Sequence, residues 1–397
     1  MPYRSPVSEY RFLLDHVVPL GPLLLSDRFG HVTGDLADAV LTAAARVCDE
    51  VLAPLNRAGD RHPARLENGV VRTAPGFAEG FRAIADAGLV SMSAPSEYGG
   101  LDLPESLGTA VNEMMSGACM ALQLNPLLTQ GQIAALAQHA SDGIKALYLP
   151  KLISGEWSGT MNLTEPQAGS DVGALSTRAE DAGDGTYRIT GQKIFITWGD
   201  SDVTSNVCHL VLARLPGAPA GTKGISLFLV PKFIPDSDGK PGRANDLKVV
   251  SVEHKMGVHG SPTCVMAYAG ATGWLVGDVN GRGRTAVGGR IRGRTAAVWT
   301  DPGPSRCASH ACRDEGRCLC RAGDCGQLRD GNGYGPCGEG RRLGGARGVS
   351  DADCQGVLHG RGLQRHRNGD AGPWRDGVYR RDGRGAVLPR RAHHADL

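Results

Sequence analysis

The stretch Met161-Asn162-Leu163-Thr164-Glu165-Pro166-Gln167-Ala168-Gly169-Ser170-Asp171-Val172-Gly173 begins in a predicted strand and continues into a loop of small residues. Glycine lets a backbone approach a ligand closely, and successive N–H groups form concavities that bind anions. Such a loop can therefore donate hydrogen bonds to a diphosphate, and the Thr164 hydroxyl can hydrogen-bond an electron-poor heterocycle. From these residues alone, an ordinary Gly/Ser turn is the alternative.

A second segment, Phe195-Ile196-Thr197-Trp198-Gly199, lies at the end of another predicted strand. It places two aromatic rings around a hydroxyl group. Packing of inward-facing rings in a core is the alternative interpretation of these aromatics.

The spacing of apolar residues divides the sequence around these segments. Apolar residues recur every three to four positions at 35–55, 75–88 and 106–151, which predicts amphipathic helices. Pro126 is expected to interrupt the last of these. From Trp157 the pattern alternates, with strands predicted at 187–190, 193–197, 207–212 and 225–230. The sequence therefore predicts an α+β fold, with an N-terminal all-α domain at 1–156 and a middle β-domain at 157–280.

Composition excludes several classes of protein. The chain has 397 residues, of which 41% are hydrophobic and 21% charged, and its formal net charge is +2. Neither disorder throughout nor a nucleic-acid polycation is implied. Residues 1–20 lack the apolar run of a signal peptide, and no later stretch reaches the ~20 apolar residues of a membrane span. We expect a cytoplasmic protein with no membrane span, no nucleic-acid partner and no metal site.

Taken together, the two segments resemble the two flavin-contacting motifs of the acyl-CoA dehydrogenase family in order and spacing. Three further pieces agree: GL at 88–89 with APSEYGG at 94–100, GISLFLVP at 224–231, and KMG at 255–257 with GSPT at 260–263. The resemblance covers residues 1–280. The opening residues and the insertion at 231–245 are most similar to the larger branch that contains 3-methylmercaptopropionyl-CoA dehydrogenases.

The resemblance implies FAD as the cofactor and α,β-dehydrogenation of an acyl-CoA thioester. In that reaction a carboxylate removes the α-proton, while flavin N5 takes the β-hydride. The resemblance also implies electron-transfer flavoprotein as a partner. The resemblance implies homo-oligomers for the intact family, but we do not expect one for this chain.

Carried over residue by residue, the resemblance implies a set of flavin contacts. The backbone near Met161 and Leu163 and the hydroxyl of Thr164 are expected to meet the isoalloxazine. Gly169 and Ser170 are expected to meet the cofactor diphosphate or the CoA chain, so Ser170 is also the candidate substrate-binding residue.

The second segment is expected to cover the other side of the flavin ring with Phe195 and Thr197. Phe195 stands where the family more usually has Trp, which keeps an aromatic wall without its N–H donor. For Asp171 and His259, capping or surface roles are expected rather than catalysis. No residue of 1–280 matches the family's catalytic glutamate.

Residues 281–397 differ sharply in composition from the rest. They hold 25 of the 57 glycines, 22 arginines and 7 of the 11 cysteines, but no Lys, Met or Phe. Glycine at this density disfavours helices by about 1 kcal/mol per site. The family's C-terminal four-helix bundle, which supplies the glutamate and part of the FAD site, is therefore expected to be missing, with a disordered, off-frame tail in its place.

A codon argument supports the frameshift interpretation. Read out of frame by one nucleotide, 351–397 can be back-translated to LTPIVKAFFTD, then LGGMGYIEETG over 373–383, then QFYRDARITPIY. These strings resemble the family's C-terminal signature. In the same frame, a family Tyr-Glu pair spelled TAT GAA puts the stop codon TGA directly after Leu397, so we expect a truncated and inactive dehydrogenase.

Two alternatives give the tail a role. A zinc site could be built from its cysteines and His310, but no CxxC pair occurs there. Its arginines could bind nucleic acid, but they are not interleaved with aromatics. The competing hypothesis for the whole chain is a non-enzymatic flavin- or acyl-CoA-binding remnant with a basic or metal-binding tail.

Overall fold

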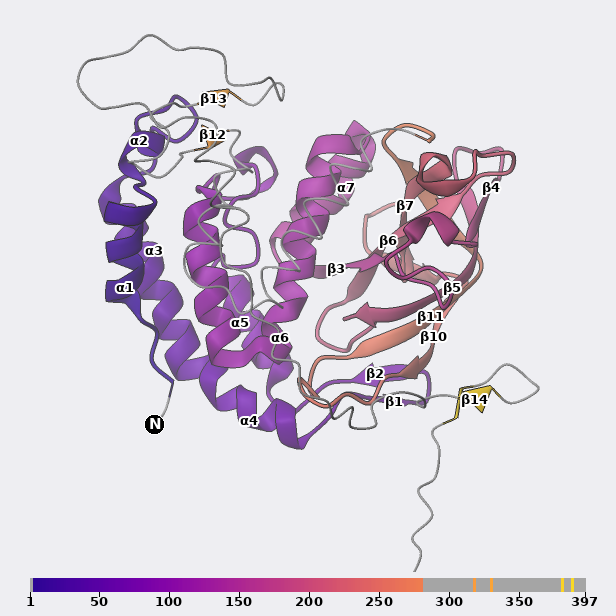
Figure 1. Ribbon diagram of the computed structural model, residues 1–397, viewed down its shortest axis with the longest axis horizontal. Helices are drawn as coiled ribbons and strands as arrows, with labels where there is room; N and C mark the ends of the chain where they lie inside the picture. Colours follow the sequence, from indigo (N-terminus) through magenta and orange to yellow (C-terminus); the bar gives the residue numbers. More distant parts are fainter. Residues whose placement is uncertain (1–2, 281–316, 319–328, 331–379, 382–386, 389–397) are drawn as a thin grey trace, which may run out of the picture. The chain divides into compact units, whose positions relative to one another are not determined.

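A computed structural model describes residues 3–280, 317–318, 329–330, 380–381 and 387–388. The chain divides into two units, Met1–Asn332 and Gly333–Leu397. The helices and the main sheet belong to the first unit, with helices gathered on one side and strands on the other (Figure 1). The confirmed fold class is mixed helix and sheet.

The chain up to Ile153 is mostly helical. The α-helices are α1 Val7–Phe12, α2 Gly21–Leu24, α3 Gly34–Val47, α4 Ala53–Arg61, α5 Phe77–Asp86, α6 Glu105–His139 and α7 Asp142–Ile153. Two short π-helical turns lie in this region, Leu13–Val17 directly after α1 and Cys48–Leu52 between α3 and α4. A small hairpin of β1 Arg65–Glu67 and β2 Val70–Arg72 lies between α4 and α5.

The break within the last helical region was misplaced by the sequence prediction. Pro126 lies inside α6, while Cys119 has the non-helical angles φ −156° and ψ 83°. The two arms of α6 meet through amide hydrogen bonds, with Asn112 Nδ2 donating to Gln130 Oε1 at 2.8 Å and Gln123 Nε2 donating to Asn112 Oδ1 at 3.3 Å. The packing of the two arms of α6 thus depends on paired amide side chains, which no local sequence pattern reveals.

Strands occupy the chain from Trp157 to Val276. They are β3 Trp157–Asn162, β4 Arg178–Asp181, β5 Tyr187–Thr197, β6 Asn206–Arg214, β7 Ile225–Pro231, β8 Phe233–Pro235, β9 Pro241–Ala244, β10 Leu247–Val252 and β11 Thr263–Val276. Short 3-10 turns lie at Ser96–Tyr98, Val172–Ala174 and Gly221–Gly224. Beyond residue 280, β12 Arg317–Cys318 pairs with β13 Arg329–Asp330, and in the second unit β14 Arg380–Arg381 pairs with β15 Val387–Leu388.

The main sheet has the order β10-β11-β5-β4-β6-β3. Because β7 pairs with both β11 and β6, the strands β11, β5, β4, β6 and β7 close into a ring. Ile189, Val211, Phe228 and Met266 belong to one buried cluster formed by these strands. β3 runs parallel to β6 at the edge and contacts α6, so it joins the sheet to the helices.

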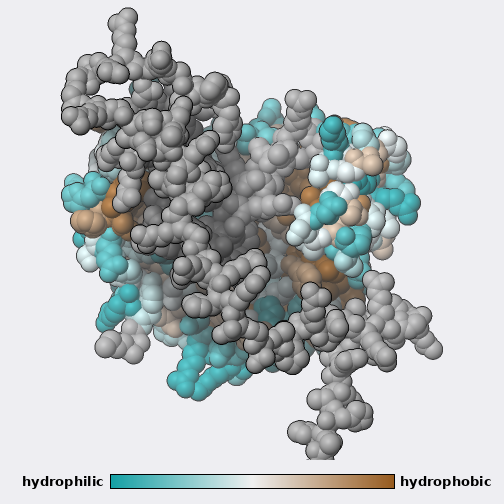
Figure 2. Space-filling view, viewed as in Figure 1, coloured by the Kyte–Doolittle hydropathy of each residue, from teal (hydrophilic) through white to brown (hydrophobic). Residues whose placement is uncertain are grey.

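The surface is mixed, with hydrophilic and hydrophobic residues interspersed over the described part of the face in Figure 2. Among the described helices, none is long and apolar enough to cross a membrane.

Candidate functional site

The loop after β3 exposes its later residues and holds its earlier ones. Met161 is buried, Leu163 and Thr164 are half-buried, and Gly169 and Ser170 are exposed. The backbone N–H of Ile194 donates to the Thr164 carbonyl at 2.9 Å. The structure therefore brings the loop beside β5, directly before Phe195.

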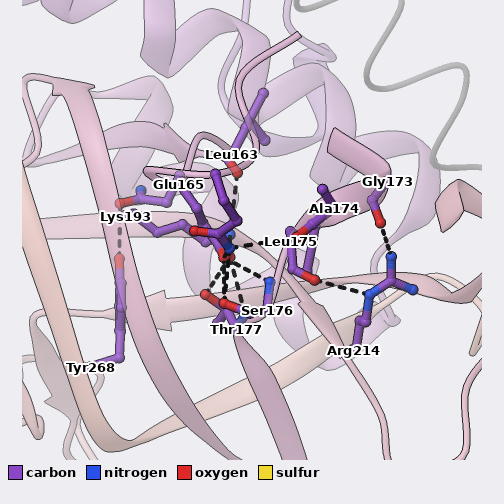
Figure 3. A network of polar contacts seen from close by, with 12 residues as sticks. Leu163, Glu165, Gly173, Ala174, Leu175, Ser176, Thr177, Lys193, Arg214 and Tyr268 are labelled. Atoms are coloured by element: carbon purple, nitrogen blue, oxygen red, sulfur yellow. Dashed lines mark hydrogen bonds and ion pairs between the residues drawn. The ribbon is translucent and has the colours of Figure 1, made fainter. Parts of the chain in front are cut away.

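Glu165 is the hub of this loop (Figure 3). Its side chain is 2% exposed and lies 2.7 Å from Lys193 Nζ, which is fully buried on β5. The carboxylate also accepts hydrogen bonds from Ser176 N at 2.7 Å, Thr177 Oγ1 at 2.6 Å and Gln167 Nε2 at 2.7 Å. Buried charges need such compensation, so this carboxylate anchors the loop.

The electrostatics agree with an anchoring role. Burial raises the pKa of Glu165, but Lys193 and the surrounding donors outweigh that effect and lower the pKa to about 2. Burial lowers the pKa of Lys193 to about 8, opposed by Glu165. Lys193 Nζ also donates to the Leu163 carbonyl at 3.2 Å. A carboxylate held ionised by so many donors is a poor proton acceptor.

Arg214 holds the far end of the loop (Figure 3). Its guanidinium donates to the carbonyls of Gly173, of Leu175 at 3.0 Å and of Gly221 at 2.8 Å. Asp171 is exposed, and its carboxylate accepts from Gly173 N at 2.9 Å. Asp171 is thus in a capping position.

The second segment is a bulged strand end. The β5–β11 register shifts between Cys264 and Met266, which leaves an extra residue on β5. Phe195 lies in this bulge with φ 58° and is 59% exposed. The bulge therefore turns an aromatic ring outward while Ile196, the next residue, stays buried.

The two aromatics of this segment have opposite environments. Trp198, with φ 52°, is 1% exposed, stacks on Phe77 at 6.4 Å between ring centroids, and donates from Nε1 to the Ala121 carbonyl at 3.1 Å. The interpretation that these aromatic rings pack in the core is therefore correct for Trp198 and wrong for Phe195. Thr197 is half-buried between them, and its carbonyl accepts from Thr160 Oγ1 at 2.7 Å.

His259, which the sequence analysis considered beside Asp171 as a catalytic group, takes no part in the loop interactions described above. Its Nδ1 is 3.1 Å from Asp60 Oδ1, and its Nε2 is 2.9 Å from the Lys255 carbonyl. Among the residues that the structure describes, no cluster of three His, Cys, Asp or Glu side chains could hold a metal ion. The zinc alternative for the tail lies outside the described residues.

Sequence reasoning missed Lys193 and Arg214, which hydrogen-bond the loop, and His209, whose Nε2 lies 2.8 Å from the Gly199 carbonyl. A signal existed for Lys193, since it occupies an inward position of a strand whose other inward residues are apolar. An inward lysine needs a buried acidic partner. Its partner, Glu165, could be identified only from the fold.

Family comparisons match both parts of the first unit. The N-terminal domain of acyl-CoA dehydrogenases matches residues 35–156, and the middle domain matches residues 160–270. Together the two matches cover more than half of the chain.

Named relatives agree with these matches. A 3-methylmercaptopropionyl-CoA dehydrogenase of Ruegeria pomeroyi is 46% identical over 280 residues, 70% of this chain and 48% of the relative. A butyryl-CoA dehydrogenase of Syntrophomonas wolfei is 37% identical over 292 residues, 71% of this chain and 48% of the relative. The chain thus spans about half the length of these curated relatives.

A solved structure shares the fold. An acyl-CoA dehydrogenase from Bacillus anthracis, complexed with FAD, superposes with a TM-score of 0.53 at 21% identity, covering 68% of this chain and 41% of that one. Through its N-terminal and middle domains, this chain belongs to the acyl-CoA dehydrogenase family, whose cofactor is FAD.

Proposed function

We propose that residues 1–280 are the flavin-contacting half of an FAD-dependent acyl-CoA dehydrogenase. The observation that carries this proposal is the juxtaposition of two predicted flavin segments, joined by the Ile194–Thr164 backbone bond and the Lys193–Glu165 pair. These segments come from different strands, and both leave polar groups open next to an exposed ring.

The donor set fits a flavin. Within the described part of the chain, the hydroxyls of Thr164, Ser170 and Thr197 make no hydrogen bond. Among the described residues other than its chain neighbours, no atom lies within 4 Å of the place where a Cβ on Gly169 would stand, so the loop backbone is open to a phosphate there. Phe195 offers an exposed aromatic face at the bulge.

These residues have distinct proposed tasks. Thr164 and the backbone near Met161 and Leu163 orient the isoalloxazine, and Phe195 with Thr197 covers its other side and excludes water. Gly169 and Ser170 hold the diphosphate or the CoA chain. FAD, when bound, supplies the acceptor for the β-hydride.

The identity of 46% to the Ruegeria enzyme makes 3-methylthiopropionyl-CoA the proposed substrate of the frame-restored enzyme. Electron-transfer flavoprotein is its proposed electron acceptor. A cytoplasmic location also belongs to this proposal, and the free cysteines Cys48, Cys119, Cys208 and Cys264 in the described part suit a reducing compartment.

We further propose that this chain does not turn over substrate. The family base must reach the α-carbon from the face opposite the flavin, but Glu165 is fully engaged as the anchor and Asp171 caps a turn. The composition of 281–397 supports translation in the wrong frame, so the bundle that carries the base is absent.

The test is electron transfer from butyryl-, octanoyl- and 3-methylthiopropionyl-CoA to a ferrocenium acceptor, with FAD in excess. The 397-residue chain should show no turnover, whereas a gene with its frame restored near codon 280 should give an active enzyme. Resequencing that region should reveal an inserted or deleted base. Robust turnover by the unrepaired chain would contradict the proposal.

A further inference from the structure

The turn that carries Phe195 and Thr197 is conformationally strained. Two residues other than glycine, Phe195 and Trp198, have positive φ within four positions. Such conformations cost free energy in residues with a side chain and persist only where the surroundings enforce them. Each contact that fixes this turn therefore affects where the exposed ring points.

Gly199 ends the turn in a tightly filled position. A Cβ there would stand 2.9 Å from Cys264 Cβ, 3.0 Å from Ile196 Cγ2 and 3.1 Å from Met266 Sδ. Its N–H donates to the Ile196 carbonyl at 3.2 Å. Its carbonyl faces His209 of β6, a strand on a different part of the ring.

His209 is fully buried and bridges two backbone carbonyls. Its Nε2 lies 2.8 Å from the Gly199 oxygen, and its Nδ1 lies 2.9 Å from the Val230 oxygen on β7. The ring packs edge-on against Tyr268 at 6.2 Å between centroids. Burial lowers the pKa of His209, opposed by both carbonyls and by Asp200, while Lys232 adds to the lowering.

We propose that His209 is a positioning residue for the flavin site: through Nε2 it fixes the Gly199 carbonyl and thereby the orientation of Phe195 and Thr197. This inference rests on the proposed FAD binding. A neutral imidazole carries one N–H, and the proposal places it on Nε2. The Nδ1 atom faces the Val230 carbonyl on β7 and does not reach the turn.

Two substitutions separate the positioning role from plain stability. The amide nitrogen of Gln matches Nε2 of histidine, so His209→Gln keeps a donor toward Gly199. The amide nitrogen of Asn matches Nδ1, so His209→Asn directs a donor toward Val230 and leaves the Gly199 carbonyl without one. Each variant loses one of the two contacts, and the exposed His254→Gln is the matched control.

Two readouts on the full chain decide the matter. FAD affinity, followed by flavin fluorescence, should fall about tenfold in His209→Asn, the equivalent of about one hydrogen bond. It should stay within about twofold of the parent in His209→Gln and His254→Gln. Amide hydrogen exchange of the unliganded chain over 195–201 should accelerate in His209→Asn only.

Equal losses in His209→Gln and His209→Asn, or no loss in either, would overturn the positioning role. If neither the parent nor the His254→Gln control binds FAD, the proposed function fails. The exchange measurement still decides the positioning claim in that case, because it needs no ligand.

Discussion

The loop at 163–177 and the turn at 195–199 both present hydroxyl groups that make no hydrogen bond within the described residues. The two segments are held in place by different means. The loop is organised around one buried charge pair, Glu165 with Lys193. The turn is fixed by backbone carbonyls that receive hydrogen bonds from Thr160 and His209, and by the anchored ring of Trp198. A long loop is ordered by a central charge with many donors, whereas a short strained turn is ordered by contacts at each residue.

Breaking the charge pair should have the largest effect. Lys193→Met leaves the Glu165 carboxylate buried without its cation, which should destabilise the chain by about 3 to 5 kcal/mol. Urea unfolding followed by circular dichroism measures the difference. Lys151→Met, which breaks the surface pair with Glu156, should cost less than about 1 kcal/mol. Equal effects would show that the buried pair is not the organising centre of the loop.

Acid should weaken the loop. The pKa of Glu165 lies below its ordinary value of 4.5, so the ionised carboxylate contributes stability above pH 4.5 and loses it as the pH falls toward about 2. The melting temperature of the parent should therefore fall more steeply across this window than that of Glu165→Gln. Parallel pH profiles would contradict the depressed pKa.

The turn should respond to the loss of a single hydrogen bond. Trp198→Phe removes the N–H that donates to Ala121 and should cost about 1 kcal/mol or more beyond the change in packing. Trp157→Phe is the matched control, because Trp157 is also buried and its Nε1 has no partner within the described residues. A control that loses as much stability as Trp198→Phe would assign the effect to ring size alone.

Periodicity predicted the helix-to-strand change at Trp157 because helical and alternating patterns differ over many residues. It predicted two strands at 187–190 and 193–197 where the structure has one bulged strand, β5, because a bulge depends on pairing with β11. The domain boundaries and the flavin contacts stay predictions, as does the absence of a fold in 281–397.

The pairing of the anchors could not be predicted, because it depends on long-range folding. Glu165 and Lys193 lie on different segments, and only the folded backbone brings them to 2.7 Å. Likewise, the motif around Phe195 could not tell which aromatic faces outward, since one extra residue in a strand reverses the alternation. Motifs predicted the candidate site, while long-range pairing determined its geometry.

The central claim, that loop and turn form one flavin surface, is tested most directly by titrating FAD into the 397-residue chain. Thr164→Val changes the loop, Phe195→Ala changes the turn, and the exposed Thr42→Val is the control. The account predicts weak FAD binding by the parent and the control, and about tenfold weaker binding by each site variant, which loses about one contact's worth of affinity. Unchanged affinity in both site variants, or no FAD binding by the parent chain, would contradict it.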